Sequence, residues 1–106
     1  MAYRRIYTSI HKANPTEYPA AIRAESARLQ AAGTLTRTVE PVVSPAELAE
    51  QNVGADQTKS TITEVWTSQA AMQSYRDWVK SNHPGAHNAW MAANNCTQTE
   101  ISSGEI

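Results

Sequence analysis

The chain has 106 residues, of which 41% are apolar and 18% are charged, and its formal net charge is −1. This length fits one domain with a single core, so we expect one domain over residues 1–106. The weak net charge argues against a general binder of nucleic acid or membrane surfaces, which needs concentrated positive charge. One cysteine excludes an internal disulfide framework. No apolar run approaches the ~20 residues of a membrane span and no secretory signal is visible, so we expect a cytoplasmic protein with no membrane partner.

Residues 3–11 alternate in the manner of a strand. Tyr3, Tyr7 and His11 share one face, whereas Ile6 and Ile10 share the other. The aromatic and β-branched content of this segment also favours a strand.

Residues 14–17 carry the signals of a helix start. Asn14 or Thr16 can cap the helix, Pro15 suits the first helical position, and Glu17 stands where the acid of a capping box belongs. Gly33 is suited to end the helix in the left-handed conformation. These signals predict a helix over residues 16–32.

The next predicted elements are a strand over residues 34–43, a short helix over 45–51 and a loop over 52–57. Thr and Val residues favour the strand. Pro41 cannot donate to a strand ladder, so it should lie at an edge, a bulge or a strand end. Ser44 followed by Pro45 and then by Glu47 is a capping-box pattern, which predicts the short helix.

A β-branched strand over residues 59–67 runs directly into an amphipathic helix. Ile62, Glu64 and Trp66 share one face of this strand. Thr67 or Ser68 can cap the helix that follows. The inner stripe of that helix consists of Met72, Tyr75 and Val79.

Residues 82–85 contain Pro84 and Gly85, which break this helix. A further helix is predicted over residues 86–95, with Trp90 facing inward, and a final strand over 97–101, after which the tail could extend the strand or fray. The predicted order is therefore β-α-β-(short α)-β-α-α-β.

A βαββαβ order predicts a ferredoxin-like α+β fold, in which a four-stranded antiparallel sheet carries both main helices on one face. The other face is then open. We expect Tyr7, Ile62 and Trp66 to lie on that open face, where exposure to water would be unfavourable. A second copy packed sheet against sheet would cover them, so we expect a homodimer.

Two segments resemble a known family. Residues 63–72 resemble the strand-to-helix passage of the antibiotic-biosynthesis-monooxygenase-like proteins, within the dimeric α/β-barrel superfamily. The broken helix over 82–87 resembles the kinked, histidine-bearing segment of that group. The resemblance implies a ferredoxin-like dimer. It does not select one activity, because the superfamily includes cofactor-free oxygenases acting on polycyclic phenols, haem-degrading enzymes, lactone isomerases and stress-responsive proteins. The insertion over 44–57 is longer than a tight hairpin and could reshape the barrel mouth or the dimer edge.

Three residues are candidates for proton transfer. An imidazole titrates near neutrality, so His11 or His83 could be a general base, although a strand-end histidine can also be purely structural. Glu64 could be the acid partner of that base. Alternatively, Glu64 faces solvent or pairs with an arginine such as Arg5 or Arg37, because a buried carboxylate without a partner is costly.

Aromatic side chains are the candidates for ligand contact. We expect Tyr7, Trp66, Trp78 and Trp90 to contact a ligand between the sheet and the helices, although such rings can equally be core or interface anchors. His83 and His87 are four residues apart, but Pro84 and Gly85 lie between them and no third ligand is evident, so no metal is expected.

The sequence also lacks glycine-rich nucleotide motifs, and no cofactor is expected. The favoured function is binding of a small apolar or aromatic molecule. As an enzyme the protein would be a cofactor-free monooxygenase or an isomerase-like catalyst of proton transfer. The alternative is a non-catalytic homodimer with a stress, carrier or assembly role.

Overall fold

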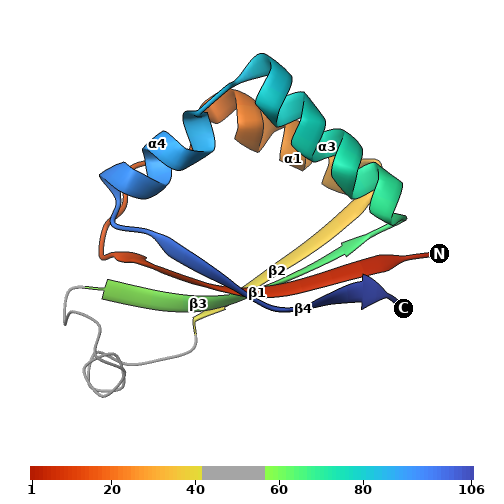
Figure 1. The fold of residues 1–106 in the computed structure, drawn as a ribbon, viewed down its shortest axis with the longest axis horizontal. Coiled ribbons are helices and arrows are strands. Elements are labelled where there is room, and N and C mark those ends of the chain that lie inside the picture. Colours follow the sequence, from red (N-terminus) through yellow and green to blue (C-terminus); the bar gives the residue numbers. More distant parts are fainter. Residues whose placement is uncertain (42–56) are drawn as a thin grey trace.

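Figure 1 shows the computed structural model of the chain, in which the helices arch over one face of a twisted sheet. The structure describes residues 1–41 and 57–106. In chain order the elements are β1 (Tyr3–Lys12), α1 (Ala20–Ala31), β2 (Leu35–Pro41), β3 (Gln57–Trp66), α3 (Gln69–Asn82), α4 (Ala86–Ala93) and β4 (Thr97–Glu105). The short helix predicted over 45–51, nearly all of the loop predicted over 52–57 and the expected effects of the 44–57 insertion fall outside the described residues.

The four strands form one sheet in the order β2-β3-β1-β4, and every neighbouring pair is antiparallel. The described helices cover a single face of this sheet (Figure 1). The predicted ferredoxin-like α+β fold is therefore confirmed. The two chain ends lie together, because the backbone N–H of Ile106 donates to the carbonyl of Ala2 at 3.0 Å.

The sheet register follows from the alternation seen in the sequence. Arg5 pairs with Glu64 and Tyr7 pairs with Ile62, so these side chains share one face. Pro41 is the last residue of β2, an edge strand, as expected for a residue that cannot donate to a ladder.

The prediction that this face of the sheet is the open one is wrong. Tyr7, Ile62 and Trp66 lie on the side of the sheet that faces the helices, not on the open side. Alternation shows which side chains share a face, but it does not show which face receives the helices. The open face instead carries Ile6 and Ile10 on β1, together with Thr36, Thr38, Thr61, Thr63 and Val65 of the neighbouring strands.

The first helix also begins later than predicted. Helix α1 starts at Ala20 and not at residue 16. The side-chain oxygen Oδ1 of Asn94 accepts a hydrogen bond from the backbone N–H of Thr16 at 2.9 Å. The indole N–H of Trp90 donates to the carbonyl of Thr16 at 2.9 Å. The N–H and the carbonyl of Thr16 are therefore used in contacts with Asn94 and Trp90. These tertiary hydrogen bonds compete with a helix start at residue 16, and they outweigh the local capping signal.

The passage from β3 into α3 agrees with the sequence. Ser68 is the N-cap, and its Oγ accepts a hydrogen bond from the backbone N–H of Ala71 at 3.1 Å. The buried cluster next to this passage consists of Tyr3, Leu35, Trp66 and Met72. It packs the start of α3 against one end of the sheet, and it leaves the middle of the arch to the cavity described below.

The C-terminal boundaries differ slightly from the predictions. Helix α4 ends at Ala93 rather than at residue 95, and β4 continues past residue 101 to Glu105. Among the described residues, the structure contains no helix with the length and apolar character needed to cross a membrane.

Candidate functional site

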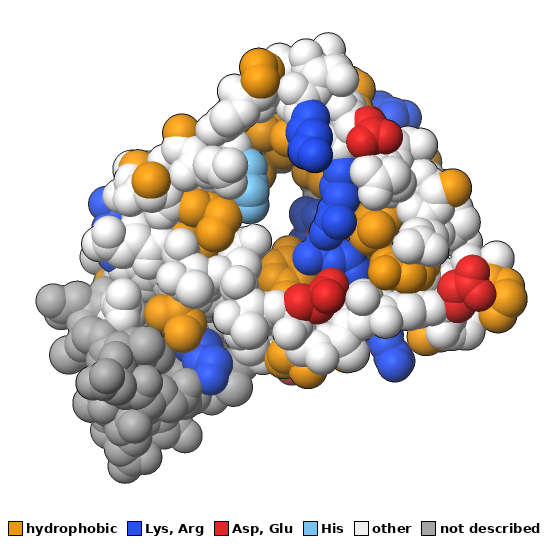
Figure 2. Space-filling model, viewed as in Figure 1, with side chains coloured by type: hydrophobic (Ala, Val, Ile, Leu, Met, Phe, Trp, Pro, Cys, Tyr) orange, Lys and Arg blue, Asp and Glu red, His pale blue; other side chains and the backbone are white. Residues whose placement is uncertain are grey.

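A cavity of about 850 Å³ lies between the sheet and the arch of helices. Figure 2 shows it as an opening between these two layers. Its walls come from all four strands, from α3 and α4, and from Tyr18 in the segment before α1. Both aromatic rings and ionisable groups line it, so the cavity can hold a small organic molecule against titratable side chains.

One end of the cavity is built from rings, and we call His11, Tyr18, His87 and Trp90 the aromatic end. The ring of Trp90 lies edge-on to Tyr18 with centroids 5.3 Å apart, and edge-on to His11 at 6.5 Å. Tyr18 and His87 are also edge-on, at 5.8 Å. Such edge-to-face contacts fix the orientation of rings, so this end presents a preformed aromatic surface.

His87 and Tyr18 form a hydrogen-bonded pair at this end, with the Tyr18 hydroxyl 2.7 Å from Nδ1 of His87. Burial and the positive charge of Arg76 lower the pKa of His87 below its usual value. Burial raises the pKa of Tyr18 to about 12. At neutral pH the imidazole is therefore neutral and the phenol is protonated, which is the state in which a histidine can accept a proton.

His11 is held in a different way. Its Nδ1 lies 2.7 Å from the backbone carbonyl of Lys12, which fixes Nδ1 as the donor when the ring is neutral. The lone pair is then on Nε2, so His11 has one nitrogen available for a ligand. His11 lines the cavity, as the base role predicted from the sequence requires.

Glu64 lies between two arginines. Its Oε1 accepts from Nη1 of Arg5 at 3.1 Å, and its Oε2 accepts from Nε of Arg37 at 2.8 Å. The carboxylate side chain is only 3% exposed, and Nη1 of Arg37 also donates to the hydroxyl of Ser26 at 2.6 Å. Of the alternatives left open by the sequence, pairing with Arg5 and Arg37 is the one that the structure shows.

The phenols beside this ion cluster are protonated. Burial, together with the nearby carboxylate of Glu64, raises the pKa of Tyr7 to about 12. Burial also raises the pKa of Tyr75, although the charge of Arg37 opposes that shift. The guanidinium of Arg5 lies 4.8 Å from the centre of the Tyr7 ring, a cation–π contact. Tyr7 and Tyr75 therefore offer hydroxyl donors to the cavity.

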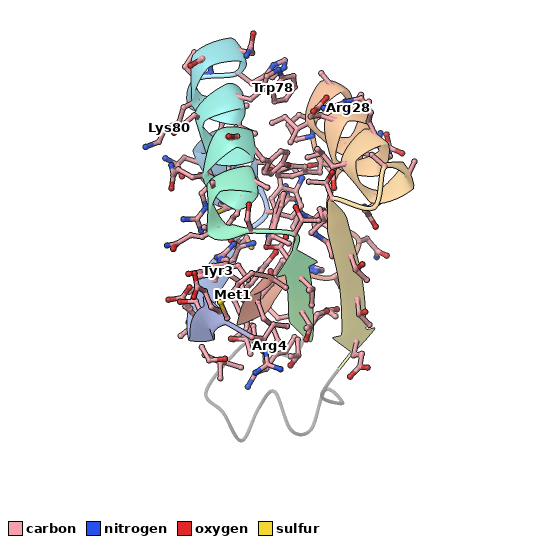
Figure 3. The ribbon with its side chains drawn as sticks, turned by 90° about the vertical axis from the view of Figure 1, so that its right-hand side faces the viewer. Met1, Tyr3, Arg4, Arg28, Trp78 and Lys80 are labelled. Carbon is pink, nitrogen blue, oxygen red and sulfur yellow. The ribbon has the colours of Figure 1, made fainter. Side chains whose placement is uncertain are left out.

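The structure brings together most of the residues predicted for the site. Tyr7, Trp66, Trp90, His11, His83 and Glu64 all line the cavity. Trp66 also belongs to the buried core cluster and is 1% exposed. Trp78 is not among the described lining residues. Figure 3 shows it between α3 and α1, away from the sheet, and its ring packs on His83 at 5.2 Å.

Within the described segments, Glu64 forms no hydrogen bond with His11 or His83, so the predicted acid–base partnership has no direct contact in this structure. His83 and His87 are separated by the break between α3 and α4. No group of three or more metal-ligating side chains occurs in residues 1–41 and 57–106.

Two residues of the aromatic end were not singled out as bases or ligand contacts by the sequence. Tyr18 was read as part of a helix stripe, and His87 was considered only for metal binding. Their contact joins positions 69 residues apart, and no local pattern reports such a pairing.

Comparison with known proteins supports the fold. No protein-family model and no curated protein matches the chain. A solved structure of a dimeric ferredoxin-like protein from an uncultured marine organism matches with a TM-score of 0.53, at 8% identity, over 100% of this chain and 96% of that one. At this identity the likeness establishes the fold alone.

Two further solved structures are more distant. SnoaB, a cofactor-independent oxygenase from Streptomyces nogalater, matches with a TM-score of 0.42, at 13% identity, over 97% of this chain and 95% of that one. A dinuclear metal-binding peptidase of the M20 family from Bacillus subtilis matches with a TM-score of 0.41, at 14% identity, over 94% of this chain and 26% of that one.

Proposed function

We propose that the cavity binds a small ring-containing molecule and that a histidine at its aromatic end removes a proton from that molecule. The observation that carries the proposal is the contact of His87 with Tyr18 in a ring-lined cavity of about 850 Å³. A general base has to be unprotonated at working pH and within reach of its substrate. The lowered pKa of His87 supports the first condition, and its place in the cavity lining supports the second.

The bound molecule is proposed to be planar because Trp90, Tyr18 and His11 present edges and faces that suit another ring. Its acidic proton would be on a phenol or on a carbon next to a carbonyl. In either case the bond from that atom to hydrogen breaks, the proton moves to Nε2 of the imidazole, and the electron pair remains on the substrate. For His87 this step uses the tautomer in which Nδ1–H donates to the Tyr18 oxygen, because Nε2 then carries the lone pair. No cofactor is required for this step.

This step is shared by both activities that the family resemblance implies. A cofactor-free monooxygenase and an isomerase-like enzyme each begin by making a carbanion or phenolate from an acidic substrate. We therefore propose proton abstraction as the first reaction, with His87 as the base and Tyr18 as the residue that positions it. His11 is the alternative base, since its Nδ1 bond to the Lys12 carbonyl leaves Nε2 available.

The test uses anthrone, a tricyclic ketone with an acidic methylene group. Exchange of that methylene with deuterium is followed by NMR in D2O under nitrogen, with and without the protein. We expect the protein to accelerate exchange, and we expect His87→Gln to reduce the acceleration by at least about tenfold, within the range known for a general base.

His83→Gln is the matched control, because His83 also lines the cavity but packs on Trp78 and has no tyrosine partner among the described residues. A loss of exchange in His11→Gln but not in His87→Gln would assign the base to His11. Binding of anthrone without any acceleration would support the alternative, a non-catalytic carrier. Absence of binding would reject the proposal.

We also propose that the chain forms a homodimer through the open face of its sheet. The similar ferredoxin-like protein is described as dimeric. On this chain the open face carries Ile6, Ile10 and Val65, which are only partly buried. Sedimentation equilibrium should then give twice the chain mass of 11.6 kDa, and Ile6→Glu should give the monomer. A monomeric wild-type protein would reject the dimer without affecting the cavity.

A further inference from the structure

Positive charge is concentrated in the cavity, although the chain as a whole has a net charge of −1. Among the described residues, the side chains lining the cavity include four Lys or Arg and one acidic residue. We call Arg5, Arg37, Arg76 and Lys80 the cationic wall. Figure 2 shows Lys and Arg side chains gathered along one side of the opening, with a histidine on the other side.

The protein itself neutralises only part of this charge. Arg5 and Arg37 share the single carboxylate of Glu64. The half-exposed Glu100 approaches Arg5 more loosely, with 3.6 Å between Oε1 and Nε. Within residues 1–41 and 57–106, neither Arg76 nor Lys80 has an ion-pair partner. An excess of positive charge therefore borders the cavity.

Hydrogen-bond donors are also in excess at this wall. Nε of Arg5 and Nε1 of Trp66 are buried and have no hydrogen-bond partner in the described part of the chain. Neither atom is exposed to the cavity, so these two donors do not by themselves identify a ligand. The hydroxyls of Tyr7 and Tyr75 stay protonated, because burial raises the pKa of each, and so they add donors rather than negative charge.

A purely structural explanation covers part of this wall. Lys80 stands in the last turn of α3, where a cation interacts favourably with the helix dipole. Arg76 lies in the interior of α3, so the dipole does not account for it, but Arg76 is exposed and water can solvate its charge. The charge of Arg76 lowers the pKa of His87, so its field reaches the aromatic end of the cavity.

We infer that the natural ligand of this cavity is an anion, an aromatic acid whose carboxylate is held by the cationic wall while its ring lies at the aromatic end. The carboxylate supplies the negative charge that the cavity lining lacks, and arginine binds carboxylates with charge-assisted hydrogen bonds. The inference rests on the proposed binding of a ring-containing molecule and specifies its class.

The test compares two probes that share one ring system, the anion 2-naphthoate and the neutral 2-naphthamide, by isothermal titration calorimetry. We expect naphthoate to bind roughly tenfold more tightly, because a hydrogen bond to a charged group is worth about one such factor. We expect that advantage to shrink as salt is raised, since ionic strength screens partly exposed charges.

Variants locate the effect. Arg76→Gln should weaken naphthoate binding by about fivefold to tenfold and leave naphthamide binding unchanged, and Arg76→Lys should restore most of the loss. Arg28→Gln is the matched control. It removes the same charge from α1, where Arg28 pairs with Glu25 and does not line the cavity. Figure 3 shows Arg28 on α1 and Lys80 of the cationic wall on α3.

The outcomes separate this inference from the proposed function. Equal affinity for the two probes, or equal effects of Arg76→Gln and Arg28→Gln, would overturn the anion site and leave ring binding intact. Binding of neither probe would overturn both. Tighter binding of naphthoate that Arg76→Gln removes would support the anion site and the ring binding on which it rests, and the exchange of anthrone remains the test of proton removal.

Discussion

Replacing Asn94 by alanine should destabilise the protein more than replacing any Asn or Gln within the described helices. Asn94 follows α4 and is 0% exposed. Its Oδ1 accepts from the backbone N–H of Thr16 at 2.9 Å, and its Nδ2 donates to the Thr16 hydroxyl and to the Trp90 carbonyl, each at 2.9 Å. The side chain thus ties the segment before α1 to the end of α4.

The size of the loss follows from these bonds. The Trp90 carbonyl keeps another donor, the backbone N–H of Asn94 at 3.1 Å, so its bond is the least important. The two bonds to Thr16 are lost outright, at about 1 kcal/mol each, and the vacated buried volume adds to this. We expect Asn94→Ala to lower the free energy of unfolding by about 2–3 kcal/mol, or Tm by roughly 10 °C or more.

The assay is urea unfolding followed by tryptophan fluorescence. Asn82→Ala is the control, because the Asn82 amide also bonds a helix carbonyl, that of Trp78 at 2.9 Å, but is exposed. It should cost less than about 0.5 kcal/mol. If Asn94→Ala cost no more than Asn82→Ala, the tie between Thr16 and α4 would not contribute to stability and the reasoning would be refuted.

Three further predictions concern charge, capping and pH. Glu64→Gln leaves two guanidiniums without their shared carboxylate and should lower the free energy of unfolding in urea by about 2–4 kcal/mol. An unchanged urea midpoint would show that solvent screens the charges of this cluster. Ser68→Ala removes the N-cap bond of α3 and should lower the free energy of unfolding by about 1 kcal/mol, whereas Ser68→Asp should keep most of that stability. Equal losses of stability in the two variants would contradict a capping role. The pKa of His87 is lowered in the folded protein from a reference value of 6.5. The unfolded chain therefore takes up the proton first, so stability should decline as pH falls below that value, and His87→Gln should remove this part of the decline in pH-dependent unfolding.

The sequence predicts local structure well where one segment determines it. The alternation from Thr61 to Trp66 and the capping residue Ser68 identify the passage from strand to helix, and both agree with the structure. The helix start over residues 14–17 was wrong, since its capping signal competes with hydrogen bonds from Asn94 and Trp90 that no local pattern contains.

The sequence predicted which aromatic residues belong to the site, but it did not predict how the side chains of the site are arranged. Trp66 and Tyr7 were placed on the same face of the sheet, but the side on which the helices pack was wrong. Pairing of Glu64 with an arginine was one of the alternatives left open by the sequence, and it is the one that the structure shows. The base was assigned to His11 or His83, because a partner for His87 exists only once Tyr18, far away in the chain, has docked.

The contacts that build the aromatic end close very long loops. Tyr18 and His87 are 69 residues apart, and the Thr16 contacts with Trp90 and Asn94 span 74 and 78 residues. Contacts of high sequence separation form slowly, because the entropy of closing the loop is lost before the contact stabilises the chain. The pairing of β1 with β4 spans still longer separations, and it brings the two segments of the aromatic end together. We therefore expect this end to form after that pairing, late in folding and after the transition state. Interactions absent from the transition state act on the unfolding rate. A ligand held at the aromatic end would therefore prolong the lifetime of the native chain by slowing its unfolding, and would leave the folding rate almost unchanged.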